Sequence, residues 1–258
     1  MTLHRTVIGE GARDLVVLHG LLGSSGNWFS LGRGPFQAVG RVHLLDLRNH
    51  GRSFHDDVHT YEAMAGDVAQ YVEEAIETPA WILGHSMGGK VAMEVALRYR
   101  SLVAGVIVAD MAPKAYDDRH TTILDALWSL PLDRLSSRRE VDEQLSASIP
   151  SEPIRQFLLK NLYTRDDGTF AWRANLPVLR RAYAGLSAQI VDADPYSGPA
   201  LFLAGSHSDY VKEADLPLIS AYFPAFEFVN IERAGHWLHA ENPKEVAAAI
   251  VRFITHND

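Results

Sequence analysis

The chain has 258 residues, enough for one α/β domain with an insertion and a large buried core. Its 24 Lys and Arg against 32 Asp and Glu give a formal net charge of −8, and no basic stripe stands out, so we expect no nucleic-acid partner. The absence of cysteine excludes disulfides, thiol catalysis and thiolate metal sites. We find no apolar run of membrane-span length and no signal-peptide core at the N-terminus, so we expect a cytoplasmic protein with no membrane partner.

Short apolar runs alternate with amphipathic stretches along most of the chain. Uninterrupted apolar runs are typical of strands in a parallel sheet covered on both faces, and apolar residues three and four positions apart indicate helices. This alternation predicts an α/β fold with a mostly parallel, doubly wound sheet and with its site at the carboxyl ends of the strands. The predicted strands are 15–18, 42–47, 81–83, 105–109, 200–204 and 226–231, and the predicted helices are 61–77, 87–98, 213–222 and 243–255.

The alternation stops between residue 111 and about residue 197. Here we expect no strand, only helical segments around 121–130, 138–148, 154–163 and 176–186. The segment is too long for a simple connection, and the strand pattern resumes after it. We therefore expect a helical cap over residues 112–197, inserted into an α/β core formed by residues 1–111 and 198–258.

The most informative motif is Gly-His-Ser-Met-Gly at residues 84–88. It lies between a predicted strand and a predicted helix, where a tight turn forces a nucleophile into strained backbone angles and exposes its hydroxyl. The flanking glycines are needed because a larger side chain would collide with the neighbouring strand and helix. We predict that Ser86 is a nucleophile.

A second motif, His-Gly-Leu-Leu-Gly at residues 19–23, directly follows the first predicted strand. Small residues there let the backbone approach the nucleophile, so the amide of Leu21 can point at a carbonyl oxygen. With the amide of Met87 it would form a two-donor oxyanion hole. For His19 itself we expect a structural role.

A serine nucleophile needs a base whose pKa lies near neutrality, and histidine is the usual one. The segment Ala-Gly-His-Trp at 234–237 follows the last predicted strand, so its loop can reach back over the carboxyl edge of the sheet. We predict His236 as the general base. For the neighbouring His239 we expect a structural role near the start of the last helix.

The acid of the triad has two candidates when only chain order is considered. The expected order is Ser, then Asp or Glu, then His. Asp110 follows the strand predicted at 105–109, and Asp209 follows the strand predicted at 200–204. The motifs at 84–88 and 234–237 resemble those of α/β-hydrolases, in most of which the acid stands three residues after the glycine that ends the later strand, a position that is Ser208 here. Asp209 is one residue further on, and a shift of one residue can turn a side chain away.

Several motifs together resemble the YbfF-type bacterial esterases of the α/β-hydrolase superfamily. The similarity runs from about Val16 to the C-terminal helix and includes the inserted segment. The matching segments are DLRNHGRS at 46–53, GHSMGGK at 84–90, DMAP at 110–113, FLLK at 157–160, NLPVL at 175–179 and GHWLHAE at 235–241.

This resemblance implies an α/β-hydrolase fold and a carboxylesterase acting on small-molecule, short-chain acyl esters without metal or cofactor. It also implies that the acid is Asp110 and that Ser208, in the later loop, lies close to the histidine as a supporting hydrogen-bond partner. Asp209 departs from the family pattern and remains the alternative acid. Other activities on the same triad stay open, namely those of a thioesterase, a carbon–carbon hydrolase, a perhydrolase or a ligand receptor.

Three further groups of residues give weaker functional signals. The segment His-Asp-Asp-Val-His at 55–59 has metal-ligand residue types, but we favour a solvated loop. We expect Asp46, Arg48 and His50 to fix the loop after the second predicted strand. Five side chains of the cap could line the substrate entrance or form the core of the cap: Trp128, Lys160, Tyr163, Trp172 and Tyr183.

Overall fold

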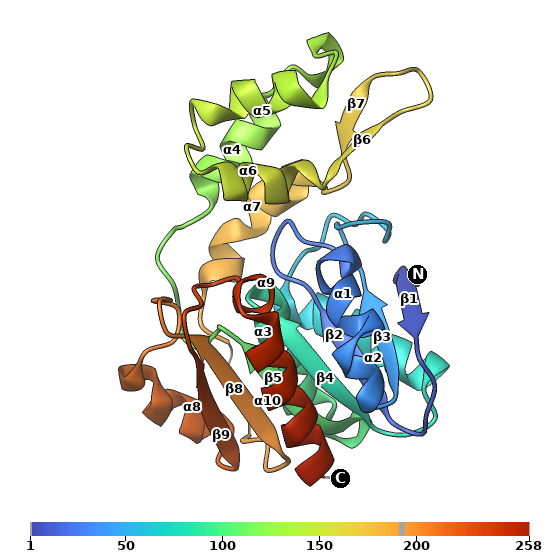
Figure 1. Cartoon of the computed structure of the whole chain (residues 1–258), viewed down its shortest axis with the longest axis vertical. Coiled ribbons are helices and arrows are strands. Elements are labelled where there is room, and N and C mark those ends of the chain that lie inside the picture. Colours follow the sequence, from blue (N-terminus) through green and yellow to red (C-terminus); the bar gives the residue numbers. More distant parts are fainter. Residues whose placement is uncertain (1, 191–193, 258) are drawn as a thin grey trace.

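The computed structural model of the chain describes residues 2–190 and 194–257. Among these residues, seven strands form one sheet in the order β1-β3-β2-β4-β5-β8-β9 (Figure 1). Every neighbouring pair in it is parallel except β1 and β3. The strands are β1 (Arg5–Ile8), β2 (Asp14–Leu18), β3 (Arg41–Leu45), β4 (Ala80–His85), β5 (Val103–Ala109), β8 (Ala200–Gly205) and β9 (Phe226–Ile231). The predicted fold class, a mostly parallel doubly wound sheet, is confirmed.

Both faces of the sheet are buried, which explains the uninterrupted apolar runs of its central strands. Alternate residues of one strand belong to different cores, as the two-residue period of a strand requires: Leu15 lies in one core and Val16 in the other. One face packs against α2 (Tyr61–Ala75), α3 (Met87–Arg98) and α8 (Leu216–Tyr222). The other face packs against α1 (Phe29–Arg33) and α10 (Pro243–His256), and the short helix α9 (Leu238–Glu241) precedes α10.

We call the chain between β5 and β8 the insertion; it includes the residues 112–197 for which a cap was expected. In Figure 1 most of its helices and strands lie in a lobe above one end of the sheet. The lobe contains α4 (Thr121–Ser129), α5 (Arg138–Ser146), α6 (Glu152–Leu159), β6 (Leu162–Thr164), β7 (Phe170–Trp172) and α7 (Leu176–Ser187).

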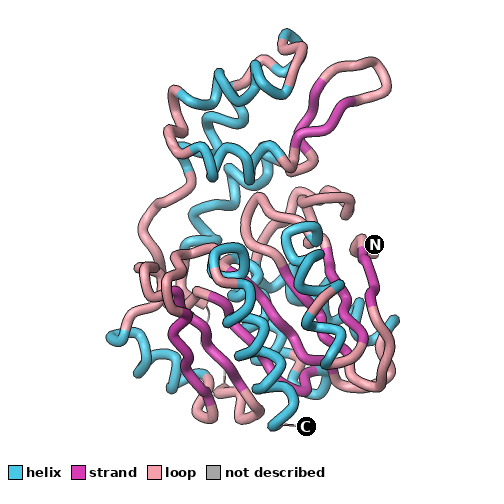
Figure 2. The backbone as a smooth tube through the Cα atoms, viewed as in Figure 1, coloured by secondary structure: helices cyan, strands magenta, loops and turns pink. Residues whose placement is uncertain are grey.

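The prediction that no strand occurs in this segment was wrong. Strands β6 and β7 form an antiparallel hairpin, seen as the magenta pair in the upper lobe of Figure 2. Helix α6 ends at Leu159, before the predicted end at residue 163. The amide of Arg165 donates to the carbonyl of Thr169 at 2.8 Å, and Gly168 adopts a φ of +87° in the turn. An Asp-Gly pair flanked by aromatic residues is a hairpin signal, but strands of three residues are too short to show a period.

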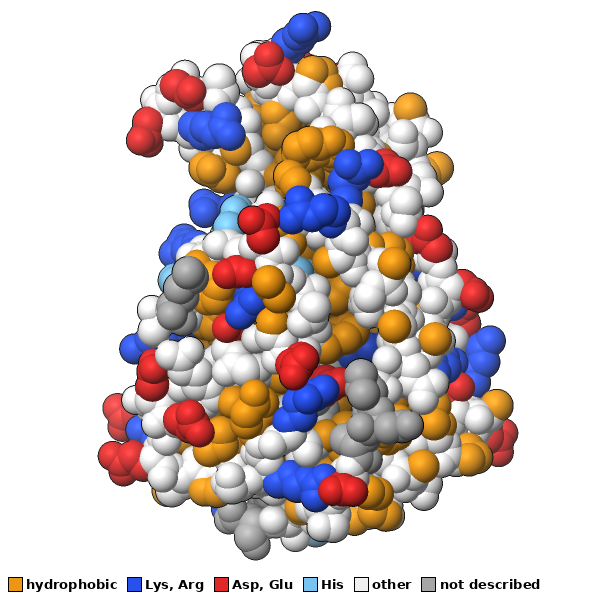
Figure 3. Space-filling model, turned by 180° about the vertical axis from the view of Figure 1, so that it is seen from behind, with side chains coloured by type: hydrophobic (Ala, Val, Ile, Leu, Met, Phe, Trp, Pro, Cys, Tyr) orange, Lys and Arg blue, Asp and Glu red, His pale blue; other side chains and the backbone are white. Residues whose placement is uncertain are grey.

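The exposed surface carries charges of both signs. In Figure 3, Lys and Arg side chains are interspersed with Asp and Glu over the face that is drawn. Within the described part of the chain, no helix combines the length and the apolar character that crossing a membrane requires.

Candidate active site

Ser86 lies in the sharp turn between β4 and α3. Its backbone has φ +53° and ψ −120°, a strained conformation for a residue with a side chain. The flanking glycines are sterically required. A Cβ on Gly84 would lie 1.9 Å from the carbonyl oxygen of Gly88, and a Cβ on Gly88 would lie 2.5 Å from that of His19. The sequence motif thus folds into the strand-turn-helix geometry that presents a serine hydroxyl.

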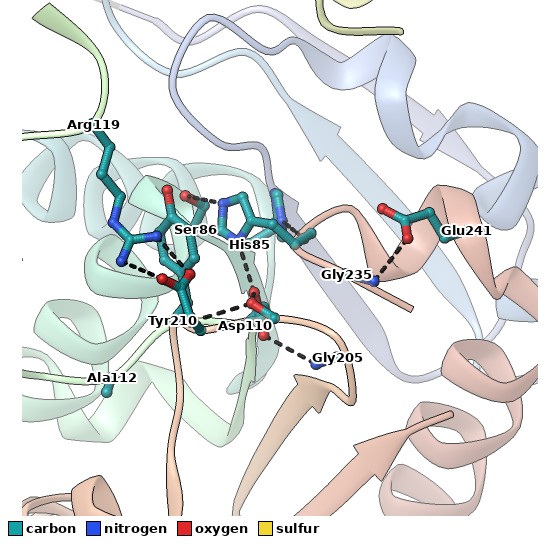
Figure 4. Close-up of polar contacts among 12 residues, drawn as sticks. His85, Ser86, Asp110, Ala112, Arg119, Gly205, Tyr210, Gly235 and Glu241 are labelled. Carbon is teal, nitrogen blue, oxygen red and sulfur yellow. Dashed lines mark hydrogen bonds and ion pairs between the residues drawn. The ribbon is translucent and has the colours of Figure 1, made fainter. Parts of the chain in front are cut away.

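A continuous chain of hydrogen bonds joins Ser86, His236 and Asp110. Figure 4 labels Ser86 and Asp110, the two ends of this chain. His236, in the loop after β9, has its Nε2 3.0 Å from the Ser86 Oγ and its Nδ1 2.7 Å from an Oδ of Asp110. With the proton on Nδ1, the imidazole donates to the carboxylate and Nε2 accepts the serine hydroxyl. The carboxyl edge of the sheet therefore brings together three residues separated by up to 150 positions.

The Asp110 carboxylate is fully buried and accepts further hydrogen bonds. The amide of Gly205 donates to one oxygen at 3.0 Å, and the hydroxyl of Ser208 donates to the other. Gly205 has no room for a side chain, since a Cβ would lie 2.3 Å from the carbonyl oxygen of Gly235. Ser208 thus bonds the same Asp110 oxygen that faces His236 Nδ1, so it supports the pair through the carboxylate.

Asp209 faces a different partner. Both of its oxygens pair with the Arg119 guanidinium, at 2.6 and 2.9 Å, and its side chain is 59% exposed. Hydrogen bonding by Arg119 lowers the pKa of the Asp209 carboxyl from its ordinary value. Of the two candidate acids, the structure brings Asp110 and not Asp209 to the histidine.

Two residues that were not predicted from the sequence, Tyr210 and Arg119, lie in succession beside the imidazole of His236. The ring of Tyr210 stacks on His236 with centroids 3.6 Å apart and planes at 14°. The guanidinium carbon of Arg119 lies 4.5 Å from the centroid of the Tyr210 ring, and Figure 4 shows both side chains beside Ser86. No sequence signal links them, because Arg119 comes from the insertion and Tyr210 from the loop after β8.

The loop after β2 approaches the serine closely. A Cβ on Gly20 would lie 3.2 Å from the Cβ of Ser86, which places the following residue, Leu21, at the edge of the site. His19 holds this loop, because its Nδ1 bonds the carbonyl of Gly20 and its Nε2 accepts the amide of Leu47. These contacts agree with the structural role expected for His19. Met87, the other expected oxyanion donor, is the first residue of α3.

A cavity of about 440 Å³ opens above Ser86, between the insertion and the core. Its apolar wall from the insertion consists of Ile123, Ile154, Phe157 and Leu158, and the core adds Leu21, Leu22, Trp28 and Trp237. Of the five cap side chains proposed for the entrance, none is among the described residues that line this cavity, but Tyr183 lines a smaller cavity that also reaches Ser86. Trp128 points outward and is 51% exposed, because the face of α4 turned toward Ser86 carries Ile123 instead.

Three further histidines line this cavity. Burial lowers the pKa of His120 to about 4 and that of His239 to about 3, and lowers the pKa of His85 strongly as well. All three imidazoles are therefore uncharged at neutral pH. His239 stacks on Trp28 with centroids 4.5 Å apart, and His85 bonds the carbonyl of His236 at 2.8 Å. The cavity is thus a largely apolar space.

The loop after β3 is held by the residues expected to fix it. Asp46 accepts the amides of Ser25 and Arg52, and His50 accepts the amide of Leu22. Arg48 pairs with Asp67.

The expectation of a solvated loop at 55–59 was wrong for His59. This side chain is 3% exposed, and its Nδ1 lies 3.3 Å from the side-chain amide nitrogen of Asn49. In the part of the chain that the structure describes, no group of three or more potential ligands could hold a metal ion.

The model of the alpha/beta hydrolase family matches residues 15–249 of this chain. The sn-1-specific diacylglycerol lipase ABHD11 of Xenopus laevis is 40% identical over 250 residues, with 93% of this chain and 79% of the relative covered. The esterase YbfF of Escherichia coli is 34% identical, with 93% and 92% covered.

A solved structure named as a marine microorganism esterase superposes with a TM-score of 0.95 at 38% identity, with 98% of this chain and 99% of that chain covered. The resemblance to YbfF-type esterases is thereby confirmed. With matches over nearly its whole length, the chain belongs to the alpha/beta hydrolase family.

Proposed function

We propose that this protein is a serine carboxylesterase in which Ser86 is the nucleophile, His236 the general base and Asp110 the acid. The observation that carries the proposal is the 3.0 Å contact of the Ser86 hydroxyl with His236 Nε2 at the floor of an apolar cavity. The strained turn that holds Ser86 and the buried carboxylate that faces His236 Nδ1 support the same roles.

Hydrolysis then proceeds in two acyl-transfer steps. His236 takes the proton of Ser86 as the serine oxygen attacks the ester carbonyl carbon, and the amides of Leu21 and Met87 donate to the resulting oxyanion. His236 next gives this proton to the alcohol oxygen as the carbon–oxygen bond breaks. A water molecule repeats the sequence on the acyl-enzyme and releases the acid. Every proton is handled by a side chain of this chain, so the scheme requires no cofactor.

The insertion serves in this proposal as the cap, over residues 112–197, on a core of residues 1–111 and 198–258. Its support is the set of apolar insertion side chains above Ser86. They keep bulk water from the ester and strengthen the electrostatic interactions that stabilise the oxyanion. The relatives reported above are named as an esterase or a lipase, but their names differ on which ester is cleaved. The acyl and alcohol groups of the substrate must therefore be inferred from the shape of this cavity.

The test is the hydrolysis of p-nitrophenyl acetate by the purified protein and by Ser86→Ala. We expect the variant to lose at least about 10³-fold in kcat while keeping its circular dichroism spectrum. A matched control is Ser129→Ala, which removes an exposed hydroxyl from α4 and should leave the rate unchanged. A fluorophosphonate should label Ser86 alone.

Two results would reject this function. An active Ser86→Ala protein would remove the nucleophile from the scheme. A single slow turnover with tight retention of the product would favour the ligand receptor instead.

A further inference from the structure

Two cavities of very different size meet at the Ser86 hydroxyl. The larger has a volume of about 440 Å³ and the smaller about 40 Å³. An ester bound for attack must place its carbonyl carbon at this junction and send its acyl and alcohol halves away from it in different directions. The residues that line both cavities are Leu21, Ser86, Arg119, His120 and Tyr210.

The catalytic groups divide between the two cavities. Among the described residues, His236 lines only the larger cavity and Met87 only the smaller. In the proposed scheme His236 Nε2 protonates the leaving alcohol oxygen, so the alcohol half must extend from the histidine side of the tetrahedral carbon. The oxyanion faces the amides of Leu21 and Met87. The alcohol half therefore takes the larger cavity, which His236 lines, and leaves the smaller cavity to the acyl substituent.

The volume of the smaller cavity limits what it can hold. One water-sized group needs roughly 10–15 Å³ on this measure, so about 40 Å³ holds about three non-hydrogen atoms. That is the length of a propyl group beyond the carbonyl carbon.

Its walls are also fixed in place. The hydroxyl of Tyr61 donates to the carbonyl of Leu186 at 2.7 Å, and that of Tyr116 donates to the carbonyl of Tyr210 at 2.9 Å. Tyr183 Oη accepts the amide of Arg119 at 3.0 Å. The first two bonds tie the insertion to the core and the third joins two parts of the insertion, so the smaller cavity cannot widen without breaking bonds of its own walls.

On the basis of the proposed function, we propose that the substrates are short-chain esters of bulky apolar alcohols. An acyl group from acetyl to butyryl occupies the smaller cavity. The alcohol group, aromatic or long aliphatic, occupies the larger cavity against Trp28, Ile123, Phe157 and Trp237.

Two ester series separate the two halves. The first keeps p-nitrophenol and lengthens the acyl chain from acetate to dodecanoate. The second keeps acetate and enlarges a primary alcohol from ethyl to hexyl, decyl and 2-phenylethyl. Each kcat/KM is divided by the rate constant of alkaline hydrolysis of the same ester, so that differences in intrinsic reactivity cancel.

We expect kcat/KM to fall by at least about 100-fold between butanoate and dodecanoate, because the smaller cavity rejects added methylenes. In the alcohol series it should rise by at least about 10-fold from ethyl to hexyl or 2-phenylethyl acetate, because apolar surface is buried. A preference for long acyl chains together with indifference to the alcohol would overturn the assignment.

Two variants test the walls separately. Leu186→Ala enlarges the smaller cavity and should move the acyl optimum to six or eight carbons. Phe157→Ala enlarges the larger cavity and should change only the alcohol series. If Leu186→Ala changes the alcohol series and Phe157→Ala changes the acyl series, the acyl and alcohol groups occupy the opposite cavities and the proposal is wrong.

If a variant fails to fold, the acyl and alcohol series measured on the native protein still test the assignment of the two cavities. The proposed esterase function itself would be rejected by a different result, a folded native protein that hydrolyses no ester of either series.

Discussion

The side chains of Asp110 and Asp209 are chemically identical, but their surroundings give them different burial and different partners. Asp110 is fully buried and bonded to His236, whereas Asp209 is largely exposed and paired with Arg119. Asp110→Asn should lower kcat on p-nitrophenyl acetate by about 10⁴-fold, because an amide cannot hold the imidazole in the tautomer that accepts the serine proton. Asp209→Asn loses an exposed ion pair and should change kcat by a few-fold at most. The opposite ranking would show that the acid is Asp209.

The contact between Ser86 and His236 could be expected from local sequence, because each residue lies in a short motif at the end of a strand. It was not sufficient to choose between Asp110 and Asp209. Both follow strands at the correct edge of the sheet, and the choice rested on resemblance. Arg119 and Tyr210 could not be predicted at all, since their contact joins the insertion to a core loop across about 90 positions, and pairings of that kind leave no local pattern.

At the scale of elements, the turn between β4 and α3 depends on the absence of a side chain at Gly84. Gly84→Ala would bring a Cβ to 1.9 Å from the carbonyl of Gly88, so the turn must open. We expect a loss of about 3 kcal/mol or more in the free energy of unfolding, measured by urea denaturation, together with the loss of esterase activity.

The matched control is Gly185→Ala in α7, where a Cβ would meet nothing within 4 Å. It should stabilise the protein by up to about 1 kcal/mol, because alanine favours the helix. Equal midpoints for Gly84→Ala and the native chain would mean that the turn tolerates a side chain.

The elements that were predicted and those that were missed differ in burial. Strands β2, β4 and β8 are buried at every position, so their apolar runs were visible. Strand β1 alternates between exposed and half-buried residues at the edge of the sheet, and its four residues gave too few repeats for a period. The face of α4 turned toward Ser86 was unpredictable for another reason. Periodicity identifies an apolar stripe but not the lobe that it contacts, so the sequence named Trp128 and gave no reason to name Ile123.

At the scale of the whole molecule, the fold buries several imidazoles in neutral form. Among them, His59, His85 and His239 each have a pKa lowered from the ordinary value of 6.5, with burial as the main cause. Below pH 6.5 the unfolded chain binds protons at these side chains and the folded chain does not. Their contribution to stability is therefore fully present above pH 6.5 and is lost as the pH falls, which for His59 and His239 continues down to folded-state pKa values of about 4 and about 3.

At pH 5, His59 and His239 should each cost about 2 kcal/mol of the free energy of unfolding. Urea denaturation at pH 7.5 and 5.0 measures this loss in the native chain. His239→Phe keeps a ring against Trp28 and removes one buried imidazole, so it should reduce the loss by about 2 kcal/mol. His256→Phe removes an exposed imidazole at the end of α10 and should leave the loss unchanged. An identical pH dependence in the native chain and in His239→Phe would show that His239 is already protonated at pH 5 in the folded protein. Water would then have to enter the cavity above Ser86 and hydrate the charged imidazole.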